Sequence, residues 1–169
     1  FTKNCIYIPA KASKYYKQGY TLLQSDEYSQ AQMKFDQAAT YKMKKKWFFK
    51  YAREYKEHKQ YQRAADIYMK ILHYFDHDKQ AGIEYAQMEL DSLANYSKAE
   101  EITRRQVLDY HVNDADGLLL LGDIFLEWGT EKQDSEKLDA ARDQYMNLMQ
   151  LYKPNNLYSS RMMRYYIRS

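Results

Sequence analysis

The sequence is poor in the residues that build turns, disulfides and membrane spans. It has only five glycines and two prolines among 169 residues, which disfavours the frequent turns of a hairpin-rich all-β fold. The single cysteine, Cys5, excludes an internal disulfide framework. The longest notable apolar run, Leu118 to Leu121, is far shorter than the roughly 18 residues of a membrane span, so we expect no transmembrane segment here. Both a cytoplasmic and a bacterial periplasmic location stay open.

Motifs of known catalytic chemistry are missing as well. The sequence has no glycine-rich phosphate loop, no His-Glu-x-x-His zinc motif and no nucleophile elbow. His73 and His77 stand four residues apart beside Asp76 and Asp78, a combination that invites a metal hypothesis. Because His77 falls where a helix should end, we interpret these residues as capping and surface groups. We therefore predict no enzyme, no catalytic residues, no cofactor and no metal site.

Tyrosine and charge are the abundant features. Tyrosine accounts for 19 residues, which suits a fold with many half-buried positions between helices. Residues 1–60 carry 13 basic and 5 acidic side chains, whereas residues 84–143 carry 6 basic and 15 acidic ones. The last segment, residues 144–169, has 4 basic residues and no acid. The chain is thus electrically polarised along its sequence, which suits an oppositely polarised partner.

Helical periodicity runs through almost the whole chain. Apolar and small residues recur three and four positions apart, and short polar stretches interrupt the pattern. Asp78 and Asp114 are predicted N-caps, and Pro9 suits the first turn of an opening helix. The predicted helices cover about nine ranges, with ends uncertain by a few residues. These ranges are 10–25, 28–43, 45–58, 61–76, 79–93, 96–111, 115–129, 135–152 and 156–168.

An internal repeat is visible in this pattern. An alanine followed four residues later by an aromatic residue or threonine recurs four times, with the alanines 33, 35 and 42 residues apart. These alanines are Ala31, Ala64, Ala99 and Ala141. Twelve residues before the first two lies a small residue, Gly19 or Ala52, and Gly122 takes that role in the fourth unit. Two helices that cross closely need a small residue at the contact, so we predict stacked helical hairpins.

The sequence resembles the tetratricopeptide repeat (TPR) family at these positions. The family signature is Trp-x2-Leu-Gly-x2-Tyr, then Ala-x3-Phe and Pro, over about 34 residues. The best match lies in the fourth unit, at Leu118, Leu121, Gly122, Phe125, Ala141, Tyr145 and Pro154. The second unit matches at Phe48, Tyr51, Ala52, Tyr55, Ala64 and Tyr68, and the first at Tyr15, Gly19, Leu22, Ala31 and Phe35. The third unit is degenerate.

This resemblance implies an all-α fold, a right-handed α-α superhelix of about four helical hairpins with an extra C-terminal helix. The expected organisation is an N-terminal segment (1–11), a repeat array (12–154) and the first helix of an incomplete fifth unit (155–169). The four units would span about residues 12–44, 45–78, 79–114 and 115–154.

In TPR-like superhelices the first helix of each pair faces a concave groove that binds peptides or partner helices. Mapping that stripe onto this sequence predicts partner-binding residues from all four units. They are Tyr16, Tyr20, Lys46, Phe49, Lys50, Arg53, Glu84, Tyr85, Met88, Asp91, Asp116, Leu119 and Asp123. One end of the groove would be aromatic and basic, and the other end acidic and apolar.

The sequence therefore predicts a non-enzymatic protein–protein interaction scaffold. Its partner would be a protein or peptide, or a second copy bound head to tail, and a bacterial envelope or flagellar, motility-associated complex would suit it. One alternative is an RNA-binding helical-repeat protein, because residues 42–53 interleave lysines with aromatic residues. The acidic half argues against nucleic acid, since it would repel a long polyanion. Another alternative is a regulatory segment of a larger enzyme.

Overall fold

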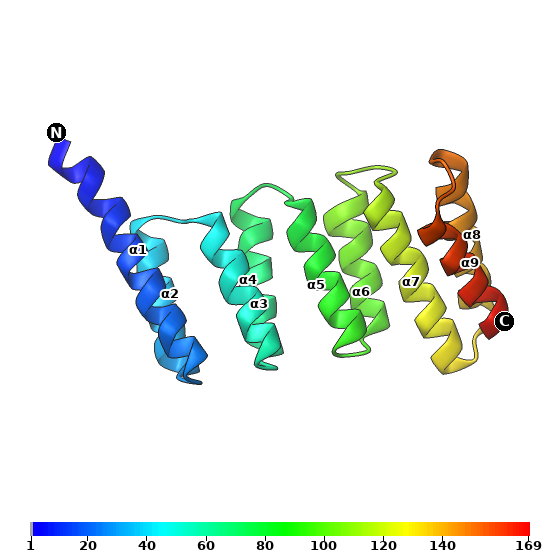
Figure 1. Cartoon of the computed structure of the whole chain (residues 1–169), viewed down its shortest axis with the longest axis horizontal. Helices are drawn as coiled ribbons and strands as arrows, with labels where there is room; N and C mark the ends of the chain where they lie inside the picture. Colours follow the sequence, from blue (N-terminus) through cyan, green and yellow to red (C-terminus); the bar gives the residue numbers. More distant parts are fainter. Residues whose placement is uncertain (1) are drawn as a thin grey trace. The chain divides into compact units, whose positions relative to one another are not determined.

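The computed structural model describes the backbone of residues 2–169 and the side chains of residues 8–169 (Figure 1). Within this part of the chain every regular element is helical. The elements are α1 (Thr2–Gln24), α2 (Tyr28–Tyr41), α3 (Lys45–Glu57), α4 (Tyr61–Tyr74), α5 (Lys79–Asp91), α6 (Tyr96–Ile102), the π-helix η1 (Thr103–Leu108), α7 (Ala115–Lys132), α8 (Ser135–Leu151) and α9 (Asn156–Arg168). The predicted all-α class is thus confirmed.

The chain divides into two compact units, residues 1–75 and residues 76–169, which we call unit 1 and unit 2. In unit 1, α1 packs along α2, α3 packs along α4, and α1 also touches α3. In unit 2, α5 packs against α6 and η1, α7 packs along α8, and α9 packs against α8 and α7. The helices therefore pack in neighbouring pairs within each unit, as the sequence pattern predicts.

Helix starts follow the predicted capping chemistry. The Asp78 carboxylate accepts a hydrogen bond from the backbone N–H of Ala81 at 2.9 Å, and Asp114 accepts one from Gly117 at 3.0 Å. Both predicted N-caps are confirmed. These bonds satisfy backbone donors that have no partner inside the helix. The predicted start near residue 10 is wrong, because α1 begins at Thr2 and Pro9 lies inside it.

The small residues lie where helices approach most closely. Gly19, Ala52 and Gly122 are all buried. A Cβ atom at Gly19 would overlap the Tyr51 hydroxyl and lie 3.0 Å from the backbone oxygen of Ala31. The role that the sequence pattern assigns to these positions, close contact between neighbouring helices, is therefore confirmed for Gly19.

Gly122 gives a direct test of this packing. Gly122→Ala should lower the free energy of unfolding of unit 2 by about 1–3 kcal/mol, although alanine normally favours a helix by about 1 kcal/mol. The added Cβ would lie 2.5 Å from Cε1 of the Tyr145 ring, which is fully buried and held by a 2.7 Å hydrogen bond to Asp123. Urea unfolding followed by Trp128 fluorescence measures the change, and the exposed Ser97→Ala is the control. A variant more stable than the parent chain would contradict this packing.

The degenerate third repeat contains the π-helix. The prediction of one regular helix over 96–111 is wrong, because the turns widen from Thr103 to Leu108. A Cβ at Gly82 would lie 2.6 Å from Val107 Cγ2, and one at Gly117 would lie 2.8 Å from Leu108 Cδ2. The two glycines thus make room on α5 and α7 for the side chains of η1.

Candidate binding surfaces

Aromatic rings and cations share the side of unit 1 formed by α1 and α3. Lys46, Lys50 and Arg53 follow one another on the exposed stripe of α3, and Tyr20 on α1 is half-buried. The Lys50 ammonium lies 3.9 Å from the centre of the Tyr20 ring and 5.1 Å from that of Trp47. These contacts hold a cation in place before any partner arrives.

Glu54 completes this cluster. The Tyr20 hydroxyl donates a 2.5 Å hydrogen bond to Glu54 Oε2. Burial, and then the hydrogen bond and the charge of Glu54, raise the pKa of Tyr20 to about 12. The phenol therefore stays protonated at neutral pH and acts as a donor. Lys46, Lys50 and Arg53 leave the exposed stripe net positive.

Two predicted groove residues of unit 1 belong to the interior instead. Tyr16 has no exposed surface; its ring stacks on Trp47 at 5.6 Å, and its hydroxyl donates to the backbone oxygen of Lys42. The prediction that Tyr16 faces a partner is therefore wrong. Phe49 is buried, and the Arg53 guanidinium lies 5.1 Å from the centre of its ring. Phe49 thus forms the support beneath Arg53.

The same ring contacts bear on the RNA alternative. Within residues 42–53, Phe48, Phe49 and Tyr51 are buried, and Trp47 is stacked on Tyr16. Stacking on nucleobases needs a ring face open to the ligand. The segment offers exposed lysines but engages its rings within the protein, so its aromatic residues do not favour RNA binding.

The predicted groove residues of unit 2 divide in a similar way. Tyr85 and Met88 are buried, so they are core residues and their assignment to a partner surface is wrong. Glu84 is half-buried, and Asp91 is exposed. The exposed Asp116 pairs with Lys79, whose ammonium lies 3.0 Å from Asp116 and 2.9 Å from Asp114. The remaining two predicted residues, Leu119 and Asp123, are half-buried.

A depression of about 490 Å³ lies on unit 2 between α5, α7 and α9. It contains two of the predicted residues, Asp91 and Asp123, and is mainly polar. Its lining residues are Gln87, Leu90, Asp91, Ala94, Tyr96, Leu120, Asp123, Glu127, Arg161 and Arg164. The first helices of successive pairs thus line one surface in this unit, as the groove hypothesis requires of them.

Ion pairs between α7 and α9 build one wall of this depression. Asp123 accepts hydrogen bonds from the Tyr145 hydroxyl at 2.7 Å and from Arg161 Nε at 2.8 Å. Glu127 accepts from Arg164 at 2.9 Å and from Arg168 at 2.7 Å. Sequence reasoning missed these arginines, although their spacing of three and four residues matches the spacing of four between Asp123 and Glu127.

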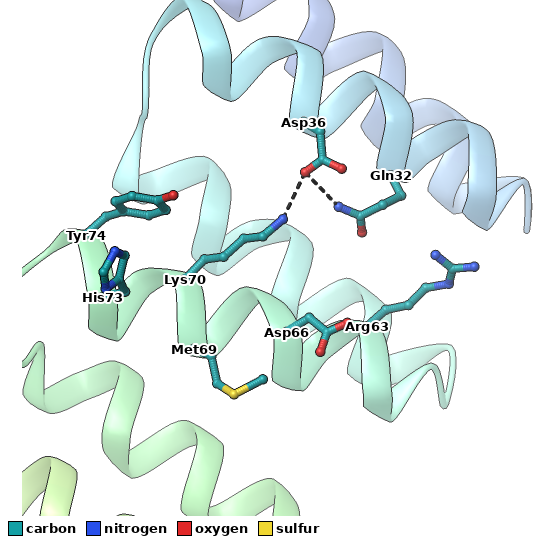
Figure 2. Close-up of a pocket in the computed structure, with 8 residues that line it drawn as sticks. All are labelled: Gln32, Asp36, Arg63, Asp66, Met69, Lys70, His73 and Tyr74. Atoms are coloured by element: carbon teal, nitrogen blue, oxygen red, sulfur yellow. Dashed lines mark hydrogen bonds and ion pairs between the residues drawn. The ribbon is translucent and has the colours of Figure 1, made fainter.

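A second cleft, on the α2–α4 side of unit 1, is also absent from the sequence predictions. Figure 2 shows Lys70 of α4 reaching across to Asp36 of α2, which also accepts a hydrogen bond from Gln32. The Lys70 ammonium lies 2.9 Å from the Asp36 carboxylate. The cleft has a volume of about 550 Å³. The one available signal was the separation of 34 residues between Asp36 and Lys70, which equals the repeat length.

The histidines do not gather into a metal site. His73 is exposed and lines the α2–α4 cleft, while the ring of His77 stacks on Tyr110 at 3.4 Å in unit 2. Among the described side chains, no three His, Cys, Asp or Glu residues form a cluster suited to a metal ion. Cys5 lies outside the described side chains. No helix in the described part of the chain combines the length and apolar character needed to cross a membrane.

Comparison with known proteins finds no family model that matches this sequence and no matching curated protein.

Proposed function

We propose that the chain is a TPR-like helical-repeat scaffold without catalytic activity, which binds a protein partner within a larger assembly. The proposed fold is the right-handed superhelix of about four hairpins and one additional helix. Its strongest support is the spacing of side-chain contacts along the sequence. Tyr20–Glu54 and Asp36–Lys70 in unit 1 are 34 residues apart, and Tyr96–Glu131 in unit 2 is 35 apart.

Such spacing is typical of stacked repeats. Equivalent positions of successive repeats become neighbours when each hairpin packs on the next one. The Tyr51 hydroxyl donates to the backbone oxygen of Tyr16, 35 residues earlier, at 2.8 Å. Lys79 and Asp114 in unit 2 repeat this separation. Because these bonds occur in both units, they favour one repeating architecture over two unrelated helical folds.

The binding role is supported by the ordered cations on the α1–α3 side of unit 1. Lys50 contacts two aromatic rings, Tyr20 and Trp47, and Arg53 lies over Phe49. Side chains that are fixed before binding lose less conformational entropy when a partner docks. Arginine and aromatic residues also anchor many protein interfaces. This surface is therefore suited to hold an acidic segment of a protein.

A pull-down experiment tests this proposal. The double variant Lys50→Glu/Arg53→Glu should lose most of the protein retained by the parent chain at low salt, because it reverses the charge of the α3 stripe. The parent chain should release the same protein at high salt, since exposed charges are screened. Arg105→Glu/Lys153→Glu, which reverses two exposed cations of unit 2, is the matched control. Equal retention by both double variants would contradict a binding role for the stripe.

A further inference from the structure

The α2–α4 cleft of unit 1 continues into a smaller apolar cleft. The smaller one has a volume of about 240 Å³ and shares Asp36, Lys70 and Tyr74 with the larger one. Together they form a single furrow, which we call the outer cleft. It lies between α2 and α4, whereas the cation stripe of the proposed function lies on α3.

The apolar end of the outer cleft is shaped for one bulky side chain. The buried rings of Phe35 and Phe48 line it, together with Ala39, Met43 and Tyr74. Met43 is 41% exposed and Tyr74 is 48% exposed, although both are large hydrophobic residues. Exposed apolar side chains gathered around a depression are typical of interaction sites. Methionine adapts its shape to a ligand, which suits the rim of such a site.

The polar end has two acidic and two basic side chains, so its formal charge is zero, and attraction for an acidic ligand comes from the cations around it. Asp36 is already neutralised by Lys70, and Asp66 accepts a hydrogen bond from Gln62. The Arg63 guanidinium, also on the rim, makes a long 3.4 Å hydrogen bond to Ser29 Oγ.

More cations lie beside the apolar end. Met43 belongs to the run Lys42-Met-Lys-Lys-Lys, in which Lys42 and Lys45 are exposed. Unit 1 as a whole has 15 basic and 6 acidic residues, a formal charge of +9. A field of this sign attracts anionic segments and repels cationic ones.

We propose that the outer cleft is a docking site for an acidic amphipathic segment of a partner protein, with one bulky aromatic or aliphatic residue as its anchor. The anchor fills the apolar end between Met43, Ala39 and Tyr74. Flanking carboxylates meet Arg63 at one end and the lysines beside Met43 at the other. The site uses other residues than the α3 stripe, so it stands or fails separately from the proposed function.

Methionine methyl NMR of the full chain tests this site directly. The probe is a synthetic peptide of glutamate and alanine with one central Leu-Phe pair. Its addition should shift the methyl signals of Met43 and Met69, which border the cleft. Met163, 64% exposed on α9, should stay unshifted. Shifts of Met163 equal to those of Met43 would overturn the proposal, and so would the absence of any shift.

Two control peptides separate the contribution of the apolar anchor to binding from the contribution of charge. Replacing the Leu-Phe pair with alanine should weaken binding about tenfold or more, because burying a large apolar side chain contributes about 1.5–3 kcal/mol. Replacing the glutamates with lysines should abolish binding. If the anchor-free peptide bound as tightly as the Leu-Phe peptide, binding would reflect general charge attraction, and the proposed site would be wrong.

Matched variants on α2 locate the binding. Thr40→Glu, on the rim of the cleft, should weaken binding of the acidic peptide about tenfold, the effect expected for a like charge placed beside it. Gln37→Glu makes the same charge change on the same helix outside the cleft and should weaken binding clearly less than Thr40→Glu does. Both positions are exposed, so neither change threatens the fold. Equal weakening by both, or loss of binding in Lys50→Glu/Arg53→Glu alone, would place the peptide elsewhere.

Discussion

Replacing Tyr51 with alanine should lower the free energy of unfolding of unit 1 by about 3–5 kcal/mol, the usual cost of truncating a buried aromatic residue. Tyr51 has no exposed surface. Its ring centre lies 4.8 Å from that of Phe35 and 6.4 Å from that of Tyr16, so it joins α1, α2 and α3. Removing the ring leaves a cavity that rigid neighbours on three helices cannot fill.

The Tyr51 hydroxyl contributes separately. Tyr51→Phe keeps the ring but removes the 2.8 Å hydrogen bond to the Tyr16 backbone oxygen. This variant should lose about 0.5–1.5 kcal/mol, the net value of one such bond. The difference between the alanine and phenylalanine variants then isolates the packing of the ring.

Urea unfolding with Trp47 fluorescence measures both variants, in a background where Trp128→Phe removes the signal of unit 2. The control is Tyr74→Ala, since Tyr74 is 48% exposed and its truncation should change stability by no more than about 0.5 kcal/mol. If Tyr51→Ala proved as mild as Tyr74→Ala, the aromatic core of unit 1 would not be organised around Tyr51.

The helices and their pairing could be predicted because they depend on local chemistry. Asp78 and Asp114 indicate where helices begin, because their carboxylates can cap a helix N-terminus, and both form the expected capping hydrogen bonds. Gly19 and Gly122 mark close helix contacts, since any larger side chain would collide with a tyrosine ring or hydroxyl. Each of these features depends on a few neighbouring residues, so it can be predicted from the sequence alone.

The solvent-facing side of each helix is harder to predict, because it depends on how far the helix is rotated about its axis. Successive residues of a helix point about 100° apart, so a small error in rotation exchanges the core face for the solvent face. For this reason the sequence prediction assigns Tyr16, Tyr85 and Met88 to the partner-binding surface, whereas all three are buried. Tyrosine makes the choice more difficult, since it suits both the core and an interface.

The sequence pattern predicts neither the long-range ion pairs nor the π-helix. Asp123 pairs with Arg161, 38 residues later, and no local rule selects that partner. The π-helix at Thr103–Leu108 depends on tertiary contacts, because Gly82 and Gly117 on other helices leave the space that η1 fills. Such features become visible only when packing between helices is known.

Unit 1 should unfold between about pH 10 and pH 12, because burial shifts the ionisation of its core tyrosines. Burial raises the pKa of Tyr16 and of Tyr55 to about 12, from 10.0 for an exposed phenol. Burial also raises the pKa of Tyr51, with smaller contributions from neighbouring tyrosines. The folded state holds these protons more tightly than the unfolded state, so their stabilising effect is complete below pH 10 and is lost as the pH rises through 12.

The size of the pH effect on stability follows from the number of tyrosines whose ionisation is coupled to unfolding. Each buried tyrosine that ionises only on unfolding lowers stability by up to about 1.4 kcal/mol per pH unit. Tyr16, Tyr51 and Tyr55 have no exposed surface, so together they lower it by up to about 4 kcal/mol per pH unit. Domains of this size are stable by only about 5–15 kcal/mol, so unit 1 should unfold cooperatively in this range.

Absorbance at 295 nm reports tyrosinate, and circular dichroism at 222 nm reports helix. The helical signal of unit 1 should fall together with the appearance of its buried tyrosinates, at a higher pH than the ionisation of exposed tyrosines. Single-tryptophan variants separate the units: Trp128→Phe leaves Trp47 as the reporter of unit 1, and Trp47→Phe leaves Trp128 for unit 2. Burial also raises the pKa of Tyr145 in unit 2, so that unit should show the same coupling with a shallower pH dependence. Complete tyrosine ionisation near pH 10 with an unchanged helical signal would mean that water reaches these phenols in the folded chain, and the aromatic core described for unit 1 would be wrong.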